Sequence, residues 1–319
     1  MTSRTPDPSR VVRRDRVGTA ELDRVRAVIA AATETDGVGP LDEAAMLDLA
    51  NGTYLLVPAA DSASPGDDPG PLAGFARLLD GASTASADLV THPAYRRRGI
   101  GNNLLATLTA ETAGRELRIW AHGPHPAAAP LAAAHRMRAV RELWRMSRPL
   151  LGPDAPELPE PSLPAADAGA DAVRIRTFRP GEDDAGWLRA NARAFANHPE
   201  QGRLGEADLL ERMSQPWFSA SGFFVAERDG RIIGFHWTKV HPTEGQRPPV
   251  GEIYVLGVAE PMRGLGTALA ITGLRHLAGL GVRTAILFTE SDNEPAIGLY
   301  RKLGFSHTAS DVMYAGPAA

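Results

Sequence analysis

The sequence predicts an α/β protein with mixed (α+β) sheets, built as two tandem copies of one domain. The chain has 319 residues, more than a typical single domain and enough for two ordinary cores. A Pro- and Ala-rich segment lies near the middle, and the order strand, Arg-Gly turn, helix, strand is found once on each side of it. Hydrophobic residues make up 43% and charged residues 23% of the chain, a composition that can bury both cores.

The middle segment defines the expected domain boundaries. Residues 150–171, LLGPDAPELPEPSLPAADAGAD, combine Pro, Ala and acidic residues with almost no periodic apolar positions. This composition is typical of a linker, and the proline spacing favours an extended chain. We therefore expect an N-terminal domain in residues 1–150, a linker in 151–171 and a C-terminal domain in 172–319.

In the first half, ASADLVTHP (85–93) predicts a strand that ends before the Arg-Gly turn. GIGNNLLATLTAETAG (99–114) then predicts a helix closed by its last glycine, and LRIWAHG (117–123) predicts another strand. The order of elements is therefore strand, turn, helix, strand.

The second half repeats this order. GEIYVLGV (251–258) predicts the strand, GLGTALAITGLRHLAGLG (264–281) the helix and TAILFTE (284–290) the next strand. EPAIGLYRKLGF (294–305) predicts a further helix. The two halves therefore look like a duplication of one fold.

The turns are YRRRGIGNNL (95–104) and PMRGLGTALA (261–270). Free N–H groups of the first helical turn can bind an anion, glycine permits close approach, and arginine adds charge and forked donors. A diphosphate fits this arrangement, and the alternative is a surface turn with solvated charge. Neither turn ends in the Gly-Lys-Ser/Thr of a phosphate loop or matches the dinucleotide turn G-x-G-x-x-G, which disfavours ATP and NAD.

Composition excludes several classes of partner. A net charge of -4 gives no basic excess for nucleic acid. We see no apolar run long enough to span a membrane and no secretory signal, so we expect a cytoplasmic protein without a membrane partner, and we expect it to be a monomer. The chain has no cysteine, which excludes a thiolate nucleophile and disulfides. Because His198, His236 and His241 lack metal-ligand spacing, we expect no metal.

The turn pattern R-x-x-G-x-G between a strand and a helix resembles the acetyl-CoA pyrophosphate loop of the GNAT acetyltransferase superfamily. Arg96, Gly99 and Gly101 match it fully. Asn293 and Tyr300 occupy the positions of the superfamily's Asn after the fifth strand and of its Tyr near the thioester sulfur. The resemblance implies two tandem GNAT domains with acetyl-CoA as co-substrate. The first half lacks the matching Asn and Tyr, which implies a non-catalytic, acetyl-CoA-binding domain.

A second resemblance covers nearly the whole chain. The segments TDGVGPLDE, VRELWRM, AFANHPEQG, GFHWTKVHP and ESDN resemble the mycothiol synthase family of tandem acetyltransferases. This resemblance implies direct transfer of an acetyl group from acetyl-CoA to the cysteinyl amine of cysteinyl-glucosaminyl-inositol, which completes mycothiol, with catalysis in the second half.

The same resemblance implies site residues. It places substrate contacts at Glu43, Glu200, Lys239, Glu252 and Phe288. In the first half it places acetyl-CoA contacts at Leu89, Val90, Thr91, Arg97, Arg98, Gly99, Ile100, Gly101 and Asn102. In the second half it places them at Leu256, Gly257, Val258, Arg263, Gly264, Leu265, Gly266, Thr267, Asn293, Glu294, Pro295, Ala296, Ile297 and Gly298.

The residue chemistry is compatible with catalytic roles for Glu252 and Tyr300. An amine attacks a thioester only when it is neutral, so Glu252 would act as the base or, alternatively, would only orient the amine. Tyr300 would protonate the leaving thiolate, and the alternative is a core tyrosine without a function. A strand N–H near Val258 would stabilise the tetrahedral oxyanion.

The second turn departs from the family pattern. It is about two residues shorter than usual, and Pro261 stands where the motif begins with Arg or Gln. Phe288 replaces a family Tyr, and Gly298 replaces a family Arg. We therefore expect weaker acetyl-CoA binding in the second half. Two alternatives stay open: a tandem acetyltransferase for another amine, such as an aminoglycoside or a peptide N-terminus, and a non-enzymatic acyl-CoA-binding regulator.

Overall fold

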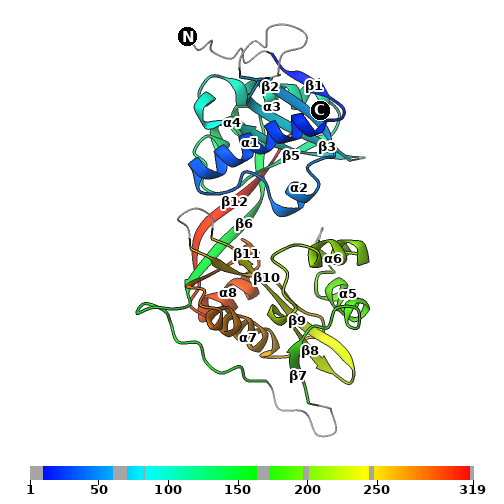
Figure 1. The fold of residues 1–319 in the computed structure, drawn as a ribbon, viewed down its shortest axis with the longest axis vertical. Coiled ribbons are helices and arrows are strands. Elements are labelled where there is room, and N and C mark those ends of the chain that lie inside the picture. Colours follow the sequence, from blue (N-terminus) through cyan, green and yellow to red (C-terminus); the bar gives the residue numbers. More distant parts are fainter. Residues whose placement is uncertain are drawn as a thin grey trace. The chain divides into compact units, whose positions relative to one another are not determined.

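The computed structural model describes residues 10–59, 70–81, 83–163, 172–196, 201–243 and 248–316. The chain forms two compact units. Unit 1 comprises Met1–Leu143 together with Ala309–Ala319, and unit 2 comprises Trp144–Thr308. Strands β6 (Arg138–Pro149) and β12 (Ser306–Ala315) therefore each begin in one unit and end in the other (Figure 1).

These two units are defined by packing. The division at residues 150 and 172 is defined by the sequence repeat, and this division remains our proposal for the functional domains. The two divisions differ because the last strand of the chain leaves the second half. Within unit 1, β12 pairs antiparallel with β5 from Val312 opposite Ala121 to Ala315 opposite Arg118.

Unit 1 contains the strands β1 (Val12–Arg14), β2 (Thr53–Pro58), β3 (Leu72–Asp80), β4 (Thr84–Thr91) and β5 (Glu116–Ala121), in that order across the sheet. Its helices are α1 (Thr19–Asp36), α2 (Glu43–Leu47), the 3-10 turn η1 (Pro93–Tyr95), α3 (Ile100–Glu111) and α4 (Ala128–Ala134). Pairing is antiparallel except between β4 and β5, which are parallel. The expected strand, helix, strand unit is thus present as β4, α3 and β5.

Alternation along β2 shows why both faces of this sheet are covered. Leu55 and Val57 pack in one cluster with Leu104 of α3, whereas Leu56 packs in another with Val28 of α1. Successive side chains of a strand point to opposite faces. Helices α1 and α3 therefore cover opposite faces, and the four central residues of β2, Tyr54–Val57, are buried.

Unit 2 repeats this architecture. Across its sheet, β7 (Arg174–Thr177), β8 (Phe223–Arg228), β9 (Arg231–His241), β10 (Val250–Val258) and β11 (Thr284–Glu290) are neighbours, followed by β6. The β10–β11 pair is parallel, whereas the β7–β8, β8–β9 and β9–β10 pairs are antiparallel. Its helices are α5 (Asp184–Ala194), η2 (Gln201–Arg203), α6 (Glu206–Met213), η3 (Ala220–Gly222), α7 (Leu265–Gly279) and α8 (Glu294–Lys302).

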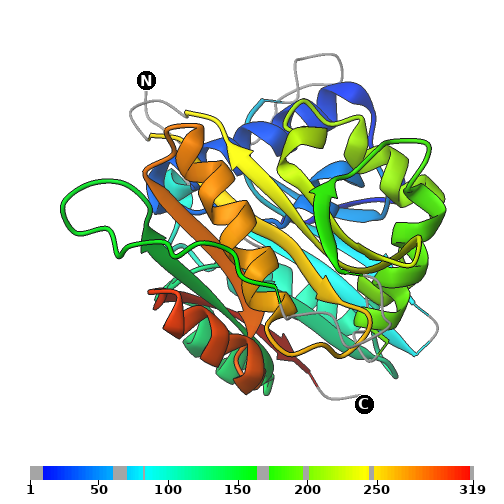
Figure 2. The ribbon, with the colours of Figure 1, turned by 90° about the horizontal axis from the view of Figure 1, so that it is seen from below.

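The β9 strand defines the two faces of this second sheet. The ring of His236 packs on Gly273 of α7, where an added Cβ would lie 2.2 Å from the histidine Cε1 atom. Phe235 and Trp237 instead pack with Trp187 of α5. Helix α7 thus covers one face, lying across β8, β9 and β10 (Figure 2), and α5 covers the other.

The described part of the predicted linker, residues 151–163, packs along unit 2. Arg148 Nη2 donates to the Pro156 carbonyl at 2.6 Å, and Arg275 of α7 donates to the Leu158 carbonyl at 3.3 Å. Arg275 also forms an ion pair with Glu160 at 2.6 Å. Two arginines therefore hold a proline-rich segment whose own N–H donors are few.

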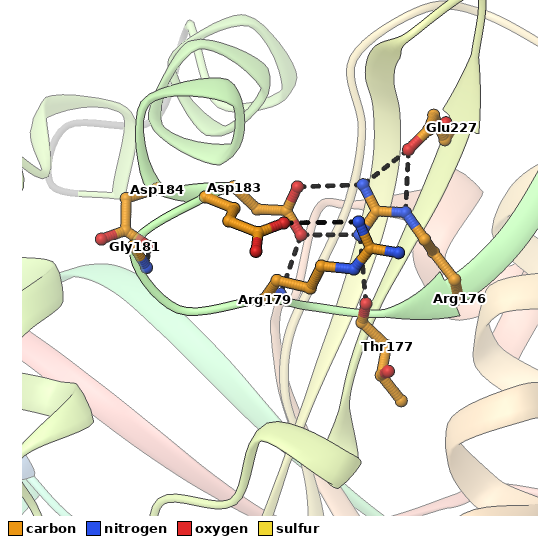
Figure 3. A network of polar contacts seen from close by, with 8 residues as sticks. Arg176, Thr177, Arg179, Gly181, Asp183, Asp184 and Glu227 are labelled. Carbon is orange, nitrogen blue, oxygen red and sulfur yellow. Dashed lines mark hydrogen bonds and ion pairs between the residues drawn. The ribbon is translucent and has the colours of Figure 1, made fainter.

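A polar network ties the short edge strand β7 to α5 and β8. Arg176 bonds both carboxylate oxygens of Asp183, at 2.6 and 2.9 Å, and lies 2.5 Å from Glu227 (Figure 3). These contacts raise the pKa of Arg176, and the bond from Arg176 lowers the pKa of Asp183. Forked, charge-assisted hydrogen bonds of this kind are stronger than neutral ones, so they fix a strand that pairs with one neighbour.

Candidate functional site

Parallel strands separate in both units. In unit 2, β10 pairs with β11 only through Gly251–Ile253 and Ala285–Leu287, although both strands continue beyond this point. In unit 1, β4 pairs with β5 only through its first four residues, Thr84–Ala87. The backbone groups further along β4 and β10 therefore have a strand partner on one side and can hydrogen-bond a ligand on the other.

A cavity of about 890 Å³ lies in unit 1 where β4 and β5 separate. Its volume is within the range of small-molecule and cofactor pockets. Every acetyl-CoA contact that we expected in the first half lines it except Arg98: these residues are Leu89, Val90, Thr91, Arg97, Gly99, Ile100, Gly101 and Asn102. Another cavity, of about 460 Å³ in unit 2, is lined by no predicted site residue.

The turn in unit 1 presents a helix N-terminus to this cavity. Gly99 is the N-cap of α3 with φ of 81°, and no side chain caps the helix. The first helical bond runs from Asn103 N–H to the Gly99 carbonyl at 3.0 Å, so the preceding N–H groups remain available for an anion. Arg98 instead turns toward the Tyr95 ring, 5.6 Å from its centroid.

The first arginine of the motif already has a partner. Arg96 bonds both carboxylate oxygens of Asp36 at 2.6 Å. Asp36 is the last residue of α1, and its pKa is lowered chiefly by the hydrogen bond from Arg96. Both residues line the cavity. No local sequence pattern predicts this pair, because its members are 60 positions apart.

The loop after β5 forms another wall of the cavity, and the sequence analysis assigned it no role. His122 Nδ1 lies 2.9 Å from Asp311 Oδ2, and Gly123 N–H donates to Asp311 Oδ1 at 2.8 Å. Asp311 and the cavity-lining Tyr314 both belong to β12. Only the pairing of β12 with β5 brings these distant residues here.

The turn in unit 2 has the same N-cap geometry, but the segment that joins β10 to the helix is shorter. Gly264 is the N-cap of α7 with φ of 85°, and Ala268 N–H donates to its carbonyl at 2.9 Å. Five residues join Val258 to Gly264, and no 3-10 turn lies among them, whereas the first copy has η1 at this place. The missing residues therefore correspond to that turn. Arg263 is exposed and makes no hydrogen bond or ion pair within the described chain, so it can face an anion.

A β-bulge distinguishes the second copy from the first. The β9–β10 register shifts between Ile253 and Val255, whereas β3 and β4 pair without a shift. Beyond the bulge, Leu256 and Val258 pack with residues of α7. An added Cβ at Gly257 would lie 2.6 Å from the Phe235 ring and 3.0 Å from Ala194 of α5. Bulges are over-represented beside active sites, where they redirect side chains.

Glu252 and Lys239 lie together on the α5 face. They are directly paired across β10 and β9, and their relative exposures are 8% and 9%. His241 Nε2 lies 2.5 Å from Glu252 Oε2, and 41% of the His241 side chain is exposed. A largely buried carboxylate is therefore linked through an imidazole to solvent.

Tyr300 lies on the opposite face of β10. It packs in the cluster that contains Ile253 and Leu274 of α7, with its ring 5.8 Å from that of Phe305. Burial raises the pKa of Tyr300. Its hydroxyl makes no hydrogen bond with any described residue. The phenol therefore stays protonated at neutral pH and has a free proton to donate.

Helix α8 begins at the predicted Asn. Asn293 is the N-cap, and its side chain accepts from Ala296 N–H at 3.2 Å. Of the other predicted contacts here, Ile297 is 5% exposed, whereas an added Cβ at Gly298 would meet nothing within 4 Å. A side chain at Gly298, where the family pattern has an arginine, would therefore begin in open space.

The remaining predicted substrate residues are dispersed. Phe288 is 42% exposed and lies just beyond the last β10–β11 pair. Glu43 begins α2 in unit 1 and does not line the cavity there. Glu200 lies outside the described residues. Neither a group of three metal-ligating side chains nor a helix able to cross a membrane is present in the described ranges.

Comparisons with known proteins place the chain in a family. The acetyltransferase (GNAT) family model matches residues 29–136 and 191–305. The mycothiol acetyltransferase of Thermobispora bispora is 46% identical over 302 residues, covering 92% of this chain and 95% of that protein. The mycothiol acetyltransferase of Thermomonospora curvata is also 46% identical, covering 93% and 94%.

Solved structures share the tandem fold. A tandem GNAT protein from the clavulanic acid biosynthesis pathway has a TM-score of 0.65 at 23% identity and covers 97% of this chain and 98% of its own. A GCN5-related N-acetyltransferase from Sphaerobacter thermophilus has a TM-score of 0.66 at 22% identity, covering 99% and 97%. Both expected resemblances are confirmed: the chain belongs to the GNAT acetyltransferase family, with two copies of its domain, and groups with the mycothiol acetyltransferases.

Proposed function

We propose that this chain is an N-acetyltransferase that transfers the acetyl group of acetyl-CoA to the cysteinyl amine of cysteinyl-glucosaminyl-inositol, giving mycothiol. The identity of 46% to mycothiol acetyltransferases over nearly the whole chain supports the reaction. The observation that supports unit 2 as the catalytic unit is that Glu252 and Tyr300 lie on opposite faces of β10 beside the point where β10 and β11 separate.

The acid-base roles follow from these positions. Glu252 takes a proton from the acceptor amine, and His241, in contact with both Glu252 and solvent, passes that proton to water. The neutral amine attacks the thioester carbonyl, and Glu252, which has lost its first proton through His241, takes the second proton from the nitrogen. The carbon–sulfur bond then breaks as the amide forms, Tyr300 donates its proton to the departing thiolate, and the phenolate regains a proton from water. Because both substrates are bound at once, the acetyl group passes directly between them.

The co-substrate is held by backbone groups and one arginine. Leu265 N–H already donates to the Met262 carbonyl at 3.3 Å, whereas the N–H groups of Gly266 and Thr267 have no backbone partner in the described chain. These two N–H groups at the start of α7 bind the diphosphate together with Arg263. The N–H groups of β10 that lack a β11 partner, near Val258, bind the pantetheine chain and the oxyanion of the tetrahedral intermediate.

Unit 1 binds acetyl-CoA without catalysing transfer. Its cavity is lined by the expected cofactor residues. However, the acidic residue of β4 is Asp88, which pairs with the buried Arg77 at 2.8 Å. Helix α4 contains only Ala, Pro and Leu. The unit therefore has no free base on β4 and no phenol on the helix corresponding to α8.

The substrate contacts remain part of the proposal. We assign acceptor binding to Lys239, Glu252 and Phe288 in unit 2, with further contacts from Glu43 and Glu200. We also infer a cytoplasmic monomer, which cell fractionation and analytical ultracentrifugation would test.

A panel of amines tests the function. Purified protein with acetyl-CoA is offered cysteinyl-glucosaminyl-inositol, an aminoglycoside and a short peptide, and the release of CoA thiol is measured. The proposal predicts the highest kcat/KM for cysteinyl-glucosaminyl-inositol. A higher kcat/KM for another amine would favour the alternative acetyltransferase, and binding of acetyl-CoA without transfer to any amine would favour the regulatory alternative.

A further inference from the structure

The Lys239 ammonium is held against two aromatic rings. Its Nζ atom lies 4.4 Å from the centroid of Trp217 and 5.1 Å from that of Tyr254. The faces of aromatic rings attract cations, and the attraction grows as water is excluded. Since Lys239 is only 9% exposed, its ammonium is a fixed positive charge on the α5 face of the sheet.

The two rings are themselves locked in place. Tyr254 lies at the β-bulge, and Arg212 of α6 donates to its hydroxyl at 3.2 Å. Trp217 and Tyr254 meet edge to face at 5.0 Å, and Trp237 packs against both, at 5.8 and 5.4 Å. Edge-to-face contacts of this kind favour one ring orientation.

The fixed charge lies beside the proposed base. Lys239 and Glu252 are direct cross-strand partners, so their Cβ atoms are roughly 5 Å apart. An acceptor amine that reaches Glu252 therefore arrives next to an ammonium. An ammonium can donate hydrogen bonds to neutral oxygens of an acceptor, and it disfavours a further positive charge placed beside it.

We propose that Trp217 and Tyr254 are specificity-determining residues of the acceptor site. By holding Lys239 beside Glu252, they select acceptors whose remaining groups are amide and hydroxyl oxygens, and they reject polycationic amines. Such discrimination uses an unfavourable contact with the wrong partner as well as favourable contacts with the right one. This inference rests on the proposed function, because it concerns the acceptor of the same reaction.

The test compares a monoamine with a polycation. The probes are cysteinyl-glucosaminyl-inositol and kanamycin, each measured as kcat/KM and as affinity for the CoA-saturated protein by calorimetry. Lys239→Met removes the charge and keeps an unbranched stem, so we expect the preference for the monoamine to fall about 10-fold. Trp217→Leu should lower it by about 3- to 10-fold, and Trp217→Phe, which keeps a ring face, should stay near the natural preference.

Two controls separate positioning from general loss of structure. In the Lys239→Met background, Trp217→Leu should have little further effect on the preference, since the ring acts through the ammonium. Phe178 belongs to the same aromatic cluster, is 2% exposed and stacks on Phe223 at 4.1 Å. Phe178→Leu should lower the thermal midpoint and leave the preference unchanged.

The outcomes distinguish this inference from the proposed function. An unchanged preference in folded Lys239→Met and Trp217→Leu proteins overturns the inference, as does an equal change in Phe178→Leu. If the protein binds the monoamine more tightly than kanamycin, loses this preference in Lys239→Met, and transfers no acetyl group, the result supports the inference and contradicts the proposed function. If the protein transfers the acetyl group and these variants leave the preference unchanged, the proposed function is supported and the inference is contradicted.

Discussion

The guanidinium of Arg96 and the carboxylate of Asp36 form two parallel hydrogen bonds of 2.6 Å at the wall of the unit 1 cavity. A forked pair of this kind neutralises the first arginine of the turn. Asp36 therefore competes with any diphosphate for that charge and also repels the anion.

Asp36→Asn should tighten the binding of acetyl-CoA to unit 1 by about 3- to 10-fold, because it removes one negative charge from the cavity wall. Isothermal titration calorimetry measures the change. Asp23→Asn is the matched control, since Asp23 lies on the same helix but pairs with Arg26 in solvent. Weaker binding in Asp36→Asn would show instead that Asp36 is needed to hold Arg96 in position.

Glu252→Gln should lower kcat by roughly 10²-fold or more, because an amide cannot accept the proton of the amine. Acetyl-CoA binding should change little. His241→Asn should keep a measurable kcat but alter its pH profile, because Glu252 loses its imidazole link to solvent. Full turnover in Glu252→Gln would remove the carboxylate from the mechanism, and identical pH profiles would remove His241 from the proton path.

Tyr300→Phe should lower kcat by roughly 10²-fold with little change in thermal midpoint. The hydroxyl makes no hydrogen bond within the described chain, so its loss leaves no partner unsatisfied. Since burial raises the pKa of Tyr300, the ratio of natural to variant kcat should stay constant between neutral and mildly alkaline pH. A ratio that falls steeply across this range would contradict a protonated phenol as the acid.

Stability should fall in mild acid because of His236. Burial lowers the pKa of this residue to about 4, against 6.5 for the ordinary side chain. Between these values the unfolded chain takes up a proton that the folded chain does not, so the unfolding free energy falls as pH falls, by an amount on the order of 3 kcal/mol. Urea unfolding at several pH values should show this slope, and His236→Leu should flatten it. An equal slope in the variant would assign the effect to other groups.

The sequence predicted the parts of the fold that depend on local patterns. The strand, turn and helix around Gly99 and around Gly264 are at the expected positions, since glycine and apolar periodicity act over a few residues. The bulge at Tyr254, the separation of β10 from β11 and the joining of Asp311 to His122 depend on pairing between distant segments. No local pattern encodes them, and so they appear only in the structure.

The central claim is most directly tested by following the acetyl group itself. Protein, acetyl-CoA and cysteinyl-glucosaminyl-inositol are combined, and the product is analysed by mass spectrometry with fragmentation that separates N-acetyl from S-acetyl cysteine. The account predicts N-acetylated product formed in step with free CoA thiol, with formation strongly reduced in Glu252→Gln. Folded protein that binds acetyl-CoA but forms no N-acetyl product would contradict it.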